Sequence, residues 1–126
     1  MVLLIVDDDA EDIEIFCEAV KSIDSSLKCI SANSGAKALD ILQSDILPDV
    51  IFLDINMPLR SGKDILIDIR KNHDYRDIVV VMYSTTMNPR EMEECRKIGA
   101  NDFLIKPSKF QDLCTAIEHL MKRIQA

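Results

Sequence analysis

Short apolar runs alternate with amphipathic stretches along the chain. Three of these runs are continuously apolar and rich in β-branched residues, a pattern typical of strands covered on both faces of a parallel sheet. They span residues 2–6, 50–53 and 78–83. Weaker strand candidates span residues 28–32 and 102–105, so we expect five strands in all.

Each run is followed by a stretch with helical periodicity. After Asp9, a residue type that caps helix N-termini, one helix face carries Ile13, Phe16, Cys17, Val20 and Ile23. After Ser108, another face carries Phe110, Leu113, Ile117, Leu120 and Ile124. Three further helices are predicted over residues 35–43, 62–72 and 88–100, the last with Pro89 in its first turn and Gly99 at its C-terminal cap.

Strict alternation of five strands and five helices predicts an α/β fold with a doubly wound parallel sheet and helices on both faces. Right-handed crossovers connect the strands in such a fold. Ligands bind there at the carboxyl ends of the strands, near the point where the strand order reverses. The function of the chain should therefore be sought in the residues that follow the strands.

Composition narrows the class of protein. The 126 residues and 48% hydrophobic content fit one compact domain over residues 1–126, with no output domain. A net charge of −7 disfavours a nucleic-acid surface and favours protein or small-ligand partners. The apolar start lacks a basic region and no segment is long enough to span a membrane, so we expect a cytoplasmic protein. The four cysteines form no C-x-x-C pair and are expected to be small buried hydrophobic residues in a reducing compartment.

Polar residues follow the strongest strands and the last one. They are Asp7 and Asp8, then Asp54, then Ser84 with Thr85 and Thr86, and finally Lys106. Three carboxylates at one edge of a sheet repel one another unless a cation neutralises them, and a hard divalent ion such as Mg²⁺ suits oxygen ligands. With a lysine and a hydroxyl beside it, one carboxylate can act as the nucleophile of a phosphoryl transfer.

At these residues the chain resembles the receiver domains of two-component response regulators, including chemotaxis receivers, over essentially its whole length. The resemblance rests on the ordered set "LLIVDDD", "FLDINMPLRSG", "VVVMYST" and "NDFLIKP". It implies a flavodoxin-like (βα)5 fold with strand order 2-1-3-4-5. It also implies that Asp54 is phosphorylated, with Lys106 and Ser84 completing the catalytic set. The implied metal ligands are Asp7, Asp8, Asp54 and the backbone carbonyl of Asn56.

The resemblance also assigns the switch. Ser84 and Phe103 form it, and the bond before Pro107 is expected to be cis, which holds Lys106 over the site. The residues expected to tune the reaction are Asn56, Thr85 and Thr86. Thr85 stands where the family often has Ala or Gly, which crowds the site. Phe103 lacks the hydroxyl of the common tyrosine, so its inward state relies on packing.

The function implied is that of a phosphorelay switch. Asp54 takes a phosphoryl group from a sensor histidine kinase or a histidine phosphotransfer protein with Mg²⁺, or alternatively Mn²⁺. The surface formed by the fourth helix, fifth strand and fifth helix then changes its binding of a downstream protein or of a second copy of the chain. Such a domain is not an enzyme, since it catalyses only its own phosphotransfer and dephosphorylation.

Two other classes of function share features with this sequence. A small Mg²⁺-dependent phosphohydrolase of the haloacid dehalogenase type also uses an aspartyl phosphate, and "FLDIN" is similar to its nucleophile motif. That motif normally lies at the first strand and has an acid where this chain has Asn56, which cannot serve as a general acid. A receiver that acts only as a phosphorylation-independent binding module is expected to lose Asp54 or Lys106, and this sequence keeps both.

Overall fold

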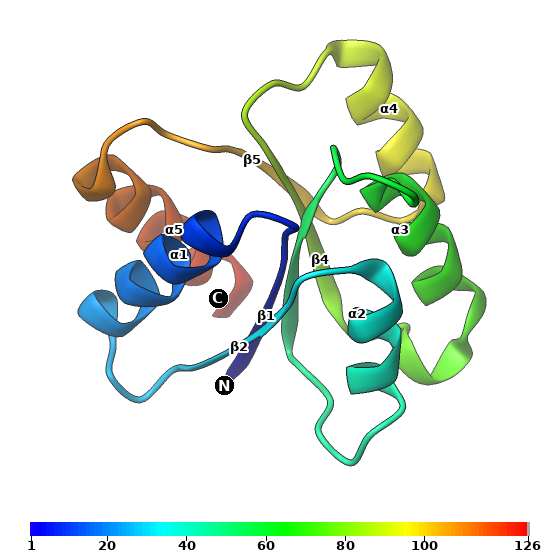
Figure 1. Ribbon diagram of the computed structural model, residues 1–126, viewed down its shortest axis with the longest axis horizontal. Helices are drawn as coiled ribbons and strands as arrows, with labels where there is room; N and C mark the ends of the chain where they lie inside the picture. The colour runs from blue at the N-terminus through cyan, green and yellow to red at the C-terminus, as the bar shows by residue number, and fades with distance from the viewer. Residues whose placement is uncertain (126) are drawn as a thin grey trace.

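A computed structural model describes residues 1–125 as a parallel sheet between two layers of helices (Figure 1). The strands are β1 (Val2–Val6), β2 (Lys28–Ala32), β3 (Val50–Asp54), β4 (Val79–Ser84) and β5 (Asp102–Ile105). The helices are α1 (Ala10–Ile23), α2 (Gly35–Leu42), α3 (Gly62–Lys71), α4 (Pro89–Ile98) and α5 (Phe110–Gln125), with a short 3₁₀ helix η1 (His73–Tyr75). The strand order is β2-β1-β3-β4-β5. The α/β fold class and the strand order are thus confirmed.

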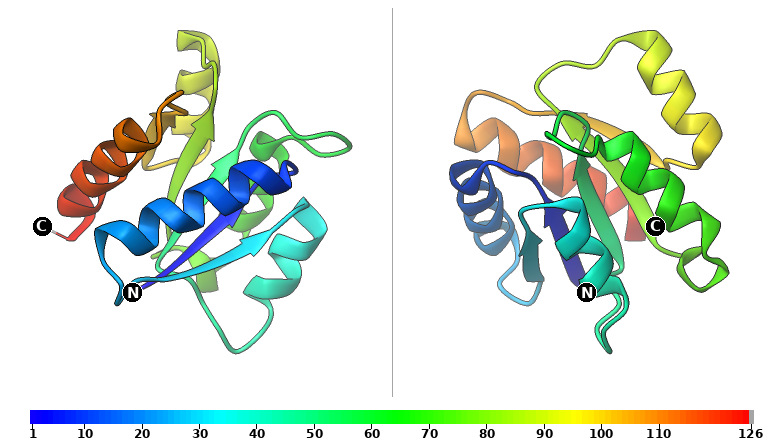
Figure 2. Two further views of the ribbon diagram at one scale, coloured as in Figure 1. Left: turned by 60° about the vertical axis from the view of Figure 1, so that its left-hand side comes forward. Right: turned by 45° about the vertical axis from the view of Figure 1, so that its right-hand side comes forward.

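The sheet has a buried face on each side. Helices α1 and α5 cover one face, and α2, α3 and α4 cover the other (Figures 1 and 2). Side chains along each strand alternate between the two faces. Leu3 and Ile5 of β1 pack with the α1 and α5 side, whereas Leu4 and Val6 pack with the α2 to α4 side. Because both faces of the central strands are covered by helices, these strands are apolar at nearly every position.

Element boundaries agree with the sequence-based predictions to within two residues. Asp9 caps α1 by accepting from the backbone N–H groups of Glu11 and Asp12, as expected. Gly99 ends α4 with φ of +132°, a conformation that favours glycine. The helix η1 was not predicted, since it lies in the polar segment after α3. No helix among residues 1–125 is long and apolar enough to cross a bilayer.

The start of α3 is packed tightly against the end of β3. Ser61 caps the helix, and its hydroxyl accepts a hydrogen bond from the backbone N–H of Asp64. In return, the Asp64 carboxylate accepts from the backbone N–H of Ser61. A Cβ atom at Gly62 would overlap the backbone carbonyl oxygen of Asp54. The glycine therefore allows α3 to begin directly beside the strand end that bears Asp54.

Candidate functional site

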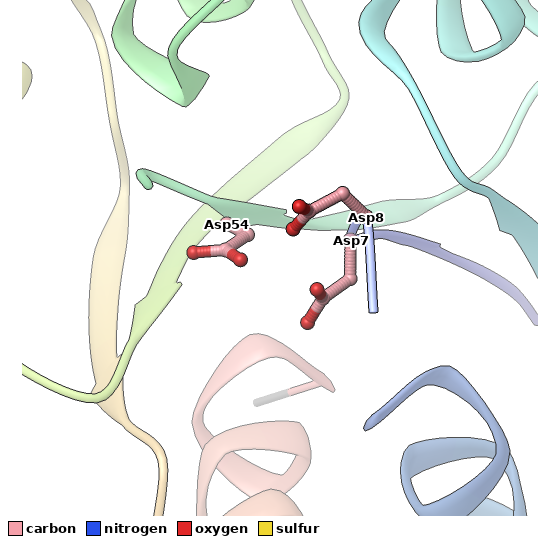
Figure 3. Close-up of side chains that lie close together, drawn as sticks. All are labelled: Asp7, Asp8 and Asp54. Atoms are coloured by element: carbon pink, nitrogen blue, oxygen red, sulfur yellow. The ribbon is translucent and has the colours of Figure 1, made fainter. Parts of the chain in front are cut away.

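Three acidic side chains meet at the carboxyl edge of the sheet. Asp7 and Asp8 follow β1, and Asp54 ends the neighbouring strand β3, where Val6 is paired with Leu53. One carboxylate oxygen from each residue lies within 4.8 Å of the others, and the three side chains extend into the same space (Figure 3). Asp7 and Asp54 are buried, whereas Asp8 is exposed. The predicted convergence of these carboxylates is confirmed.

Lys106, which follows β5, reaches into this cluster. Its Nζ lies 2.7 Å from Asp7 Oδ2 and 3.4 Å from Asp54 Oδ2. The same Nζ lies 3.2 Å from Asp12 Oδ2, a residue that the sequence analysis missed. Asp12 is in the first turn of α1, three residues after the Asp9 cap, so an acid there faces the same edge of the sheet. The ammonium group is thus shared among three carboxylates.

The prediction of a cis peptide bond before Pro107 is wrong. All peptide bonds within residues 1–125 are trans, including that between Lys106 and Pro107. The trans form is favoured even before proline, and cis needs specific support from the surrounding structure. Here Lys106 reaches the site without a cis bond. The Lys106 backbone N–H donates to the carbonyl oxygen of Ser84 at 2.7 Å, and the long side chain spans the remaining distance to the carboxylates.

A buried hydroxyl lies on the next strand. Ser84 ends β4, which runs beside β3 with Tyr83 opposite Asp54. Asn56 links the two strand ends, because its backbone N–H donates to Asp54 Oδ1 at 3.1 Å and its side-chain amide donates to Ser84 Oγ at 2.9 Å. The next two residues, Thr85 and Thr86, are exposed.

Phe103 lies on β5, opposite Met82 of β4. It is half-buried against the core on the α2 to α4 side of the sheet. The guanidinium carbon of Arg96, on α4, lies 5.0 Å from the centre of its ring, a cation–π contact. The ring is therefore held between the sheet and α4.

Burial dominates the electrostatics of the site. It raises the pKa of Asp54 to about 6, against the opposing effects of the Asn56 N–H and of Lys106, and the charge of Asp7 adds to the rise. Burial alone would lower the pKa of Lys106, but the hydrogen bond to Asp7 and the charges of Asp54 and Asp7 outweigh it and raise that pKa. Negative charge is thus in excess at this edge of the sheet.

The donor set fits a hard divalent cation. Asp7, Asp8 and Asp54 offer oxygen atoms alone, at a spacing that one ion can bridge, and oxygen ligands are what Mg²⁺, Mn²⁺ and Ca²⁺ prefer. A divalent ion would balance the carboxylate charge that the single lysine leaves uncompensated.

Known proteins are similar to this chain in sequence and in fold. A sequence model of the response regulator receiver domain matches residues 3–118. The two-component response regulator ORR3 of Oryza sativa subsp. indica is 32% identical over 111 residues, which cover 88% of this chain and 83% of that protein.

Solved structures of response regulators are also similar to this chain. Chemotaxis protein CheY4 of Vibrio cholerae matches with a TM-score of 0.82 at 25% identity, over 94% of this chain and 96% of that one. The Mn²⁺-bound form of response regulator Rcp1 matches with a TM-score of 0.81 at 28% identity, over 94% of this chain and 90% of that one.

These matches and the acidic site favour a receiver over the haloacid dehalogenase alternative. The match extends across the sheet and both helical layers, and the acid cluster lies where the doubly wound fold binds its ligands. The chain belongs to the response regulator receiver domain family, the phosphoacceptor switches of two-component signalling.

Proposed function

We propose that Asp54 accepts a phosphoryl group from a phosphohistidine of a sensor histidine kinase or histidine phosphotransfer protein, assisted by Lys106 and Ser84. The observation that carries this proposal is the ammonium of Lys106, which bridges the buried carboxylates of Asp7 and Asp54 at the carboxyl edge of the sheet. A cation already hydrogen-bonded to the nucleophile is placed to receive the negative charge that arrives with a phosphoryl group.

The proposed reaction is an in-line displacement. An oxygen of Asp54 attacks phosphorus, the P–N bond to the donor imidazole breaks, and the imidazole leaves with that electron pair, giving an aspartyl phosphate. Lys106 then pairs with one phosphoryl oxygen. The Ser84 hydroxyl donates a hydrogen bond to another phosphoryl oxygen. The side-chain amide of Asn56 still donates to Ser84 Oγ. We infer that the domain catalyses only this transfer and the hydrolysis of its own aspartyl phosphate, in which water attacks phosphorus and releases inorganic phosphate and the free Asp54 carboxylate.

The proposed metal ligands are Asp7, Asp8, Asp54 and the backbone carbonyl of Asn56, with Mg²⁺ as the ion and Mn²⁺ as the alternative. The all-oxygen donor set supports this, as does the Mn²⁺-bound form of the relative Rcp1. When bound, the ion supplies positive charge that offsets the repulsion between the carboxylates and the incoming phosphate.

The proposed switch runs from Ser84 to Phe103. A Ser84 hydroxyl drawn toward the phosphoryl group vacates space, and the half-buried Phe103 ring moves inward, away from Arg96. The surface of α4, β5 and α5 would change with it and bind a downstream protein, or a second copy of the chain, differently. The tuning roles of Asn56, Thr85 and Thr86 stay predictions.

We propose that the phosphodonor protein docks beside Lys106. A hollow of about 420 Å³ opens there between α1 and the start of α5, and its lining includes Asp12, Lys106 and the partly exposed apolar side chains of Ile15 and Phe110. Exposed apolar groups next to a reactive site suit binding to a protein surface rather than to a nucleic acid.

The proposed location of the protein is the cytoplasm.

The test is intact-protein mass spectrometry after incubation with acetyl phosphate. We expect the wild-type protein to gain one phosphoryl group in Mg²⁺ and none when a chelator is present. Asp54→Asn should gain none. The matched control is Asp9→Asn, which keeps a side chain able to cap α1 and should be phosphorylated like the wild type. Binding of beryllofluoride, a phosphoryl mimic, separates a slow donor from an incompetent site. Phosphorylation that persists in Asp54→Asn would contradict the proposal.

A further inference from the structure

Two of the four cysteines are in contact. Cys17 of α1 and Cys29 of β2 approach with their sulfur atoms 2.8 Å apart. Both are free thiols and both are only half-buried, so the expectation of buried cysteines is wrong for this pair. It holds for Cys95 and Cys114, which are buried. Nothing in the phosphoacceptor site uses the pair, because the contact lies on the edge strand of the sheet.

The fold brings the two thiols together. Cys17 follows Phe16 on the side of α1 that faces the sheet, and Cys29 is paired with Leu3 of β1. Both cysteines pack against the core cluster between the sheet and the layer of α1 and α5. The chain turns between α1 and β2, so the helix runs back over the strand that follows it (Figure 2). Two rigid elements therefore hold the sulfur atoms in place.

A small reagent can reach the sulfur atoms. A hollow of about 240 Å³ is lined by both cysteines together with Val20, Lys21 and Leu27. The positive charge of Lys21 beside the hollow favours an attacking thiolate and an anionic reagent. Cys95, by contrast, has no exposed surface.

The two thiols differ in chemistry. The hydrogen bond between the two thiols, in which either sulfur can donate, lowers the pKa of Cys17. That same hydrogen bond, together with burial, raises the pKa of Cys29. A thiol whose pKa is lowered, beside a second thiol whose pKa is raised, is the arrangement of a nucleophilic and a resolving cysteine.

We propose that Cys17 and Cys29 are a redox modification site, which a low-molecular-weight disulfide such as oxidised glutathione converts to a reversible disulfide between α1 and β2. The Cys17 thiolate attacks one sulfur of oxidised glutathione, and glutathione thiolate leaves and takes up a proton. The Cys29 thiol then loses its proton and attacks Cys17 sulfur, releasing the second glutathione. The protein loses two electrons and two protons, and one oxidised glutathione becomes two reduced molecules.

The two sulfur atoms already lie near bonding distance. The sulfur atoms need to approach by less than about 1 Å to reach the disulfide length of about 2.05 Å. The bond would close a loop over the segment 18–28 and restrict the unfolded chain. Because α1 also carries Asp12, the bond would tie the helix that contacts Lys106 to the edge of the sheet.

The test is mass spectrometry of the folded wild-type protein after treatment with oxidised glutathione. We expect a loss of about 2 Da, reversed by dithiothreitol, as two thiols become one disulfide. Trypsin should then release residues 1–21 linked to residues 29–37, while the peptides with Cys95 and Cys114 stay alkylatable. The oxidised protein should unfold at a higher urea concentration than the reduced protein.

Single variants separate the two roles. Cys29→Ala should retain a glutathione adduct at Cys17, and Cys17→Ala should form no internal bond. Cys114→Ala, a control at a buried cysteine outside the pair, should still form the bond. The proposal is overturned by four free thiols after treatment, by linkage that involves Cys95 or Cys114, or by a lower urea midpoint of the oxidised protein. These readouts do not depend on phosphorylation.

Discussion

At the scale of single residues, the site is a balance between one cation and several carboxylates. Lys106 contacts Asp7, Asp12 and Asp54, and its side chain is only 10% exposed. Asp7 has no exposed surface. A buried carboxylate that loses its partner keeps the full cost of its desolvation, whereas an exposed ion pair contributes little. Lys106 therefore matters to the fold as well as to the chemistry.

Lys106→Met tests this balance. We expect the variant to lose about 2–4 kcal/mol of unfolding free energy in the absence of divalent ions, because Asp7 and Asp54 are left without their buried cation. Added Mg²⁺ should stabilise the variant more than it stabilises the wild type, since it becomes the main compensating charge. Urea unfolding at pH 7, with and without Mg²⁺, measures both effects. Equal stabilisation of the two proteins by Mg²⁺ would show that the lysine and the metal do not share this role.

At the scale of elements, the join between β3 and α3 fixes the position of Asp54. The backbone N–H of Gly62 donates to the carbonyl oxygen of Ile55 at 3.0 Å, and a Cβ at Gly62 would meet the backbone of Asp54. Backbone atoms cannot rotate away as a side chain can, so the strand end and the helix start are held in one arrangement.

Gly62→Ala is expected to destabilise the domain by about 1–3 kcal/mol, the usual cost of overpacking, and to slow phosphorylation because the strand end bearing Asp54 must shift. Gly35→Ala is the matched control. Its Cβ would meet side-chain atoms of the buried Ile65 at 2.8 and 2.9 Å but no backbone atom, so any repacking leaves the strand end that bears Asp54 in place. Urea unfolding and phosphorylation by acetyl phosphate compare the two variants. A Gly35 variant that loses as much as the Gly62 variant on both measures would exclude this account of the join.

The elements themselves could be predicted because their signals are local. Continuous apolar runs mark β1, β3 and β4, since both faces of these strands are covered. Asp9 and Gly99 mark helix ends because capping depends on residues close in the sequence. The helix η1 escaped prediction because it is a single turn of three residues in a polar segment, too short to show periodicity.

The site could be predicted only where strand ends determine it. Asp7, Asp8, Asp54 and Lys106 converge because parallel strands end at one edge of the sheet. The contact of Asp12 with Lys106 depends instead on how α1 is placed over the sheet. The Cys17–Cys29 contact likewise depends on the packing of a helix on the following strand, although both residues carried the signal of a core-facing position.

At the scale of the whole molecule, the acid cluster is connected to a distant surface through the strands. The carbonyl oxygen of Ser84 accepts from the backbone N–H of Lys106, which joins the ends of β4 and β5. Phe103, on β5, lies beneath Arg96 of α4, and an ion pair between Lys63 and Glu94 joins α4 to α3. A change at Asp54 therefore has a continuous path of packed and hydrogen-bonded groups to α4.

Phe103→Trp tests whether that path works as a switch. The chain contains no tryptophan, so the new indole is the sole one and reports on its own surroundings. Beryllofluoride with Mg²⁺ should shift its fluorescence to shorter wavelength, because the ring leaves Arg96 and becomes buried. Introducing Ser84→Ala into the same protein should abolish the shift while ¹⁹F NMR still detects bound beryllofluoride. A shift that survives without the Ser84 hydroxyl would mean that the signal reaches α4 by another path, and no shift in either protein would mean that Phe103 is part of the core and not of the switch.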